Sequence, residues 1–187
     1  SSQPVTYETT TDFGVGAFLL AGSEVFKLAE GEIPIPEPEP ENLAINTLIA
    51  FSSQQMDPYN PASNAVDGNE ATRWSAETWP EWIEIDLGEL KTINQIELIP
   101  YQQRAYQYII ESKENVNESY STLVDKSDNI VGGYKLIDTL ASVTTRYLKL
   151  TITGCHNYTG SWVSILEFKV FGDGSTAIEI PVERNHI

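Results

Sequence analysis

The sequence predicts an antiparallel β-sandwich over residues 42 to 172, and two observations support this fold class. Apolar residues alternate with polar ones in several short segments, as expected for strands that bury one face. Glycine-containing turn signals, such as Asp67-Gly68 and Gly132-Gly133, separate these segments. Short alternating strands joined by turns are typical of two packed antiparallel sheets, so we predict an all-β domain.

Three segments carry the alternation most clearly, at residues 83–87, 148–152 and 166–170. In the first, aliphatic residues alternate with glutamate and aspartate. In the second they alternate with lysine and threonine, and in the third apolar residues alternate with Glu167 and Lys169. A strand turns successive side chains to opposite faces, so each segment has one face suited to a core.

The chain flanking the sandwich divides into three parts. Residues 12–29, within an N-terminal segment 1–31, carry apolar residues at spacings of three and four and predict a helix with an N-cap. Its apolar face is too wide to remain exposed to solvent, so we expect the helix to pack on a partner surface. Residues 32–41 alternate proline with acidic residues and predict a stiff extended linker. Residues 173–187 look like a C-terminal extension, in which residues 178–180 could add an edge strand or begin another linker.

Composition restricts the partners. Among 187 residues, 27 acidic residues against 11 basic ones give a net charge of -16. Binding to nucleic acid needs clustered lysine and arginine, which the sequence lacks, and anionic membranes are unfavourable for the same reason. No apolar run reaches the ~18 residues of a membrane span.

Catalytic and redox motifs are also missing from the sequence. One cysteine, Cys155, cannot form an internal disulfide, and no cysteine–histidine cluster has the spacing of a zinc site. Sequence motifs of serine hydrolases, zinc proteases and nucleotide-binding enzymes do not occur. We therefore expect no enzymatic activity from this chain.

Four blocks resemble the F5/8 type C family, also called discoidin-like or galactose-binding-like domains. They are Asn64–Trp74 (NAVDGNEATRW), Trp82–Gly88 (WIEIDLG), Arg146–Leu150 (RYLKL) and Leu166–Gly172 (LEFKVFG), in the family's order and spacing. The resemblance implies a discoidin-type jelly-roll β-sandwich, close to the family-32-like carbohydrate-binding modules. Trp74 and Trp82, which belong to these blocks, are predicted core residues.

The first block contains oxygen atoms suited to a hard cation such as Ca2+. Asp67 offers a carboxylate, Thr72 a hydroxyl, and Gly68 lets the chain curl so that carbonyls point inward. On the residues alone, a metal-free Asp-Gly turn with a threonine cap fits equally well. The resemblance implies a structural Ca2+ ion held by the carbonyls of Asn64 and Asn69, the side chain of Asp67, the hydroxyl and carbonyl of Thr72, the carbonyl of Leu166 and the carboxylate of Glu167.

Several loops carry the flat aromatic and planar hydrogen-bonding side chains that carbohydrate recognition needs. The candidate ligand-binding residues are Gln55, Tyr59, Trp79, Tyr101, Arg104, His156, Asn157, Tyr158 and Trp162. The resemblance places Arg104 at a sugar-contacting position, although Ala105 departs from the residue that follows it in that pattern. Arg104 could equally pair with a carboxylate, and Trp79 and Trp162 could equally be packing residues of their loops.

The N-terminal residues 11–25 resemble the closing helix of the (α/α)6 barrels of unsaturated glucuronyl and rhamnogalacturonyl hydrolases. The alternative is an ordinary amphipathic helix packed on the sandwich. The sequence thus predicts a non-catalytic carbohydrate-binding module with a structural calcium ion. We expect it to be fused to an upstream polysaccharide-degrading enzyme, a glycoside hydrolase, and to direct that enzyme to its glycan. We expect an extracellular or periplasmic bacterial protein. A second hypothesis is a structural or protein-interaction sandwich that braces a neighbouring catalytic domain.

Overall fold

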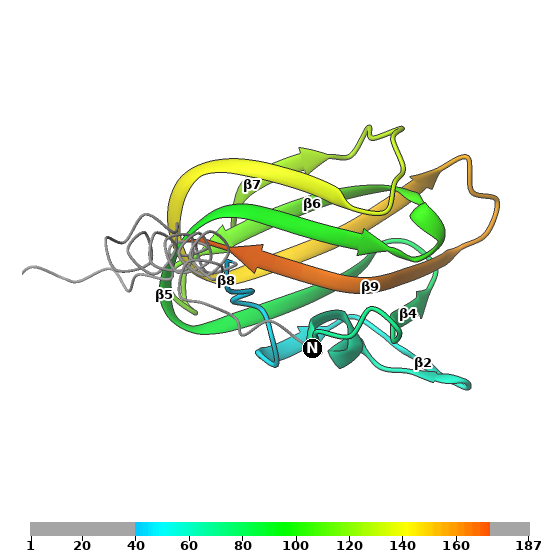
Figure 1. Ribbon diagram of the computed structural model, residues 1–187, viewed down its shortest axis with the longest axis horizontal. Helices are drawn as coiled ribbons and strands as arrows, with labels where there is room; N and C mark the ends of the chain where they lie inside the picture. The colour runs from blue at the N-terminus through cyan, green and yellow to red at the C-terminus, as the bar shows by residue number, and fades with distance from the viewer. Residues whose placement is uncertain (1–39, 173–187) are drawn as a thin grey trace, which may run out of the picture. The chain divides into compact units, whose positions relative to one another are not determined.

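The computed structural model describes residues 40–172, and Figure 1 shows its arrangement of strands. The predicted helix at 12–29, most of the linker and the C-terminal extension lie outside the described residues. The elements are β1 (Leu48–Phe51), β2 (Gln55–Met56), β3 (Tyr59–Asn60), η2 (Ala62–Val66), β4 (Trp74–Glu77), β5 (Glu81–Pro100), η3 (Tyr101–Gln103), β6 (Ala105–Lys113), β7 (Ser121–Lys126), β8 (Leu136–His156) and β9 (Trp162–Phe171).

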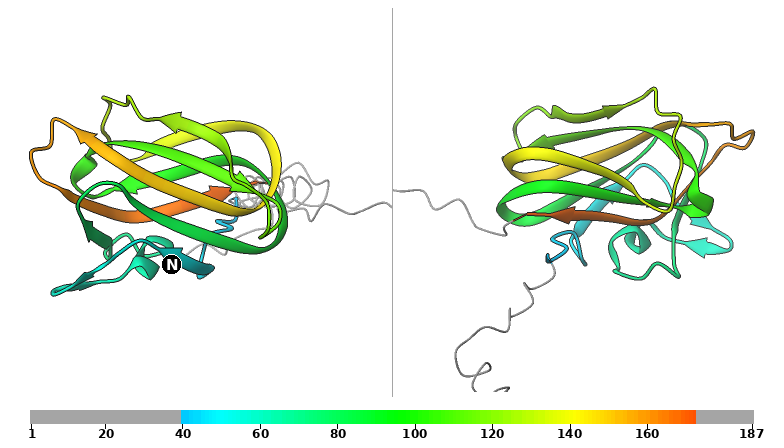
Figure 2. Two further views of the ribbon diagram at one scale, coloured as in Figure 1. Left: turned by 180° about the vertical axis from the view of Figure 1, so that it is seen from behind. Right: turned by 45° about the horizontal axis from the view of Figure 1, so that its top comes forward.

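The strands form an antiparallel sandwich, which confirms the predicted fold class. The strand order is β4-β9-β5-β8-β6-β7, with β1 also paired to β5. The long strands β5 and β8 contribute to both layers: residues 83–86 of β5 pair with β1, whereas residues 95–100 pair with β9. A register shift between Asp86 and Lys91 separates the two halves of β5. The two layers curve around one core (Figure 2).

The core follows from the predicted alternation. Along β5, Ile83 and Ile85 are fully buried while Glu84 between them is half-buried. The largest fully buried side chains are Trp74, Tyr106 and Phe168, which come from β4, β6 and β9. Each large apolar side chain removed from water contributes about 1.5–3 kcal/mol, so these strands hold the layers together.

Of the two predicted core tryptophans, only Trp74 lies in the core. It is fully buried, and its indole Nε1 donates a hydrogen bond to the carbonyl of Ser53 at 3.0 Å. Trp82 is half-buried, and the ammonium of Lys149 lies 4.8 Å from its ring centroid. The prediction for Trp82 was wrong because its neighbour Ile83 faces the core, and successive residues of a strand face opposite sides.

Five connections gather at one end of the sandwich (Figures 1 and 2). They are the β2–β3 turn, the β4–β5 connection, η3, the β7–β8 loop and the β8–β9 loop. Because these connections come from distant parts of the sequence, this end can combine many side chains in one surface. Within residues 40–172, no helix has the length and hydropathy needed to span a bilayer.

Candidate functional site

A ring of oxygen atoms lies where the loop after η2 meets strand β9. The backbone N–H of Asn69 donates to Asp67 Oδ1 at 2.8 Å and to Glu167 Oε1 at 2.9 Å. The hydroxyl of Thr72 lies 2.8 Å from both Asp67 Oδ2 and the carbonyl of Asn69. Gly68, with φ of +77°, makes the turn between them. Residues almost a hundred positions apart in sequence therefore share one site, which we call the oxygen cage, formed by Asp67, Asn69, Thr72 and Glu167.

Glu167 is the buried member of the oxygen cage. Its side chain has no solvent exposure, and Oε2 has no hydrogen-bond partner in the described structure. Burial, and next the adjacent Asp67 carboxyl, raises the pKa of Glu167 to about 7. A buried carboxylate oxygen without a partner is costly, and two carboxylates side by side repel each other. A bound cation would offset both costs.

The chemistry of the oxygen cage fits Ca2+ better than a transition metal. No group of three or more histidine, cysteine or acidic side chains gathers within residues 40–172, so a cation here must be completed by carbonyl and hydroxyl oxygens. The other two predicted ligands flank the cage. The side-chain amide of Asn64 donates a hydrogen bond to the carbonyl of Arg73 at 3.0 Å, which joins the two ends of the loop. Leu166 precedes Glu167 on β9.

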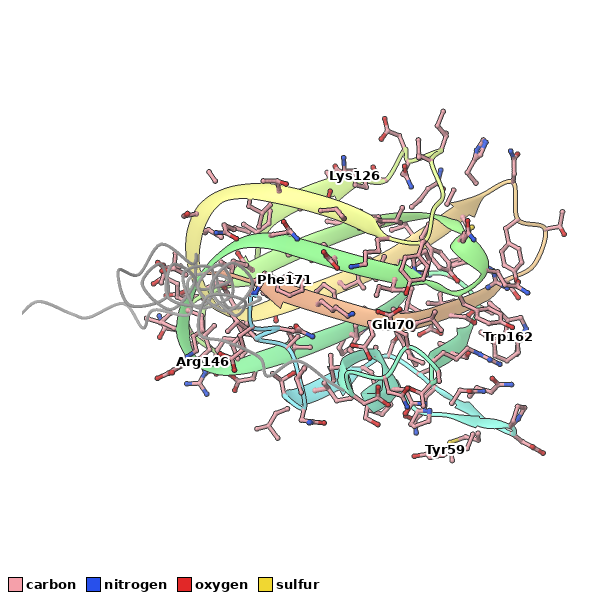
Figure 3. All side chains as sticks on the ribbon, viewed as in Figure 1. Tyr59, Glu70, Lys126, Arg146, Trp162 and Phe171 are labelled. Atoms are coloured by element: carbon pink, nitrogen blue, oxygen red, sulfur yellow. The ribbon has the colours of Figure 1, made fainter. Side chains whose placement is uncertain are left out.

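Glu70, at the tip of the same loop, connects the cage region to two other segments. It accepts hydrogen bonds from the ammonium of Lys169 on β9, at 2.8 Å, and from the phenol of Tyr134 in the β7–β8 loop. The hydrogen bond from Lys169, followed by that from Tyr134, lowers the pKa of Glu70. Glu70 thus holds the β7–β8 loop against the loop between η2 and β4 (Figure 3 labels Glu70).

The loop end of the sandwich contains an open hollow of about 400 Å3. Four of its lining residues were predicted as ligand-binding residues: Arg104, His156, Asn157 and Tyr158. Six others were not predicted: Gln102, Gln103, Ala105, Ile130, Gly132 and Cys155. We call this site the ligand hollow. It draws on η3, the β8–β9 loop and the β7–β8 loop, which no single sequence motif spans.

Arg104 lies at the centre of the residues around the ligand hollow. Its Nη1 donates to the carbonyl of Trp162 at 2.9 Å and to the phenol oxygen of Tyr106 at 3.1 Å. Its Nη2 donates to Gln102 Oε1 at 3.3 Å. A guanidinium has five N–H groups, so two remain for another acceptor. Within residues 40–172 Arg104 makes no salt bridge to a carboxylate, so the structure does not support the ion-pair alternative.

Aromatic rings surround Arg104. Its guanidinium carbon lies 4.0 Å from the ring centroid of Tyr158 and 5.6 Å from that of Tyr101. Trp79 meets the ring of Tyr158 edge-on at 6.4 Å and that of Tyr106 at 6.1 Å. Trp79 is only partly exposed and packs against the core, as in the loop-packing alternative. Stacking and T-shaped contacts of this kind fix the orientation of Tyr158.

The remaining predicted ligand residues have separate positions. Gln55 and Tyr59 lie on the β2–β3 hairpin, where the side chain of Gln55 accepts a hydrogen bond from Asn60 at 2.8 Å. Tyr59 is 62% exposed and stands apart from Trp162 (Figure 3). Trp162 begins β9 and contributes its carbonyl to Arg104. Neither hairpin residue lines the ligand hollow, and the role of both stays a prediction.

The residues that prediction missed include Ile130 and Gly132, both in the β7–β8 loop. A Cβ added to Gly132 would lie 2.3 Å from the carbonyl oxygen of Gln103, so glycine alone permits this close approach. The pair Gly132-Gly133 is visible in the sequence as a turn signal. Its neighbour Ile130, 65% exposed, carries no sequence signal that places it in a binding site.

The fold and the gathered loops define a class of protein: a jelly-roll β-sandwich with five connections gathered at one end. The chain belongs to the F5/8 type C domain family, whose model matches residues 49–168. This match confirms the family that the four sequence blocks indicated. The resemblance of residues 11–25 to a hydrolase helix falls outside the described residues.

Known structures of similar fold include carbohydrate-binding modules. Chitosan-binding module 1 from a chitosanase/glucanase of Paenibacillus sp. IK-5 is 28% identical, covers 71% of this chain and 99% of that chain, and has a TM-score of 0.63. The CBM32 of AlyQ, solved in complex with 4,5-unsaturated mannuronic acid, is 26% identical, covers 68% of this chain and 96% of that chain, and has a TM-score of 0.56.

A curated relative belongs to a polysaccharide-degrading family. The polysaccharide lyase 8 family protein HylA of Enterococcus faecalis is 40% identical over 70 residues. The matched residues make up 37% of this chain and 5% of that protein. The similarity therefore extends to only a small part of that relative.

Proposed function

We propose that this domain is a non-catalytic carbohydrate-binding module that binds glycan in the ligand hollow. The observation that carries the proposal is the meeting of Arg104, Asn157 and Tyr158 in one open hollow. Arg104 retains two N–H donors for sugar oxygens, Asn157 adds an exposed amide, and Tyr158 adds an aromatic surface. Shallow sites with a few fixed polar groups are typical of weak, reversible ligand binding.

The module would act by holding an appended enzyme near its substrate. Weak affinity suffices for this purpose, because tethering raises the local concentration of the enzyme at the polysaccharide. The carbohydrate-degrading parents of the relatives support this role, and the predicted helix at 12–29 would belong to the upstream catalytic domain. Such a protein would work outside the cell or in the periplasm, where polysaccharides are met.

We further propose that the oxygen cage binds a structural Ca2+ ion. The unpartnered Oε2 of Glu167 and the adjacent Asp67 carboxyl support this assignment. The ion would supply positive charge between two carboxylates and join the loop between η2 and β4 to the last strand, β9. It would take no part in chemistry, since the surrounding donors are protein oxygens and none is placed to activate a water.

Affinity electrophoresis tests the glycan proposal. The native gel would contain chitosan, polymannuronate or galactan, which are cationic, anionic and neutral glycans. We expect at least one of them to retard the parent domain, and Tyr158→Ala to lose much of that retardation. Tyr59→Ala should behave like the parent, because Tyr59 lies outside the ligand hollow. Loss of retardation with Tyr59→Ala alone would move the site to the β2–β3 hairpin.

A bracing role is the second candidate, and one observation favours it. Three of the five N–H donors of Arg104 are engaged within the domain, and Trp79 packs against the core, so part of the predicted sugar-binding set already has structural partners. If no glycan retards the domain, while the full-length enzyme is destabilised when the module is deleted, the bracing role is supported instead.

A further inference from the structure

The β7–β8 loop forms one side of the ligand hollow and is fixed at three points. The Asn129 side chain donates to the carbonyl of Tyr106 at 2.8 Å, which ties the loop to β6. Gly132 lies against the backbone of Gln103, and Tyr134 donates a hydrogen bond to Glu70 in the loop between η2 and β4. A segment held at its start, middle and end can present a side chain in a constant position.

The loop presents two adjacent apolar residues to different hollows. Ile130 lines the ligand hollow together with Arg104 and Tyr158. Val131 lines a second hollow, which is bounded instead by Tyr108 and Asp138. Both side chains are 65% exposed, so exposure does not distinguish them. Their difference lies in direction alone.

Ile130 is exposed in the free domain, and burial of its aliphatic surface by a ligand would be favourable. Among the other residues that line the hollow, Arg104, His156 and Asn157 offer polar groups that suit sugar hydroxyls. Ile130 adds aliphatic surface that suits the C–H face of a sugar ring or an apolar substituent on it. Glycans differ from one another in how these apolar parts are placed.

We propose that Ile130 is a specificity-determining residue of the ligand hollow, which contacts the apolar part of the bound sugar from the β7–β8 loop. Asn129, Gly132 and Tyr134 are positioning residues that hold this loop in place. The proposal rests on glycan binding in the ligand hollow. It adds a wall to that site which comes from outside the family's four sequence blocks.

The test compares Ile130→Ala with the matched variant Val131→Ala. Dissociation constants for chitosan, polymannuronate and galactan oligosaccharides would be measured by isothermal titration calorimetry. We expect Ile130→Ala to weaken the best of these ligands about three- to tenfold, since partial burial of three aliphatic carbons is lost. The ratio of affinities across the three probes should change as well. Val131→Ala should leave the constants and their ratio unchanged.

Melting temperatures separate binding from folding. Both variants should melt like the parent, because both positions are exposed. If the parent binds a probe and the two variants bind it equally well, the role of Ile130 is wrong while glycan binding stands. If Val131→Ala weakens binding and Ile130→Ala does not, the ligand lies in the neighbouring hollow. If the parent binds none of the three probes, the proposed function fails, and the role of Ile130 fails with it.

Discussion

The oxygen cage and the ligand hollow lie in the same domain but are built in opposite ways. The cage is built on a buried carboxyl: Glu167 is fully buried and the groups around it bond to one another, with Asn69 exposed on the outer side. The ligand hollow is open, and His156 and Asn157 at its edge are exposed. Burial makes the cage sensitive to charge and important for stability. Exposed residues of the hollow can be substituted with little loss of stability, and an open hollow suits reversible ligand binding.

This contrast predicts that the two regions respond to different perturbations. Changes in the cage should alter the free energy of unfolding, whereas changes in the hollow should alter glycan affinity. Within residues 40–172, the hydrogen bond from Tyr134 to Glu70 joins the loops of the two regions, and the guanidinium carbon of Arg73 lies 4.7 Å from the ring centroid of Tyr101 in η3.

The largest expected effect comes from the cage. With calcium present, Asp67→Ala should lower the free energy of unfolding by about 3–4 kcal/mol, which is the stabilisation expected of a ligand at 100 to 1,000 times its Kd. Denaturant unfolding with calcium or with EDTA measures this, and EDTA should reproduce the loss in the parent. Asp128→Ala, at an exposed aspartate of the β7–β8 loop, serves as the matched control. Equal stability of the parent in calcium and in EDTA would contradict the calcium proposal.

The second prediction concerns pH in the calcium-free domain. Folding raises the pKa of Glu167 to about 7, so the native state retains a proton that the unfolded state has lost. Stability should therefore fall as pH rises from 5 to 8, by about 2–3 kcal/mol at 1.36 kcal/mol per unit of pKa shift. Chelated protein would be unfolded at each pH by urea. Glu167→Gln should flatten the profile, and a rise in stability over this range would contradict the account.

The third prediction concerns the hollow. Arg104→Ala should weaken glycan binding by about 1–3 kcal/mol, through lost hydrogen bonds and displaced loops. Because Arg104 donates to Tyr106 and to the carbonyl of Trp162, this variant should also lose some stability. Arg104→Lys retains the charge but not the fork of donors, so it should recover stability better than affinity. Calorimetric titration together with thermal melting distinguishes the two effects. Full affinity in both variants would exclude Arg104 from the site.

The smallest expected effect concerns the link between the regions. Tyr134→Phe removes the hydroxyl group that donates a hydrogen bond to Glu70. Because the Tyr134 side chain is mostly exposed, the melting temperature should change little. Glycan affinity should fall slightly, because the β7–β8 loop loses one of its three fixed points. Hydrogen exchange across residues 127–135 would report the loosening. Unchanged exchange there would show that Asn129 and Gly132 suffice to fix the loop.

More of the fold and of the oxygen cage than of the ligand hollow could be predicted from the sequence. The strands were predictable because alternation follows from which side chains are buried. Three of the four cage residues fall between Asp67 and Thr72, and Glu167 lies in the last of the four family-like blocks. Trp82 was misplaced because membership of such a block does not say which face of a strand a residue occupies. Ile130 was missed because its position depends on how the loop packs on Gln103, a contact between residues far apart in sequence.

Arg104 and Tyr158 show the intermediate case. Their residue types suggested sugar contacts, and the structure places both at the ligand hollow. The sequence did not reveal that Arg104 donates to the carbonyl of Trp162 and lies against the Tyr158 ring. These contacts depend on the meeting of three loops from distant parts of the sequence. The alternation of apolar and polar residues within a strand does not predict such a meeting.

Chemical-shift mapping would locate the bound glycan without altering the protein. Chitosan or mannuronate oligosaccharide would be titrated into isotopically labelled, calcium-loaded domain while backbone amides are followed by NMR. We expect shifts to concentrate at residues 102–105, 130–132 and 156–158, with little change at residues 67–72. Shifts confined to the β2–β3 hairpin or to the outer faces of the sheets, or none with either oligosaccharide, would contradict glycan binding in the ligand hollow.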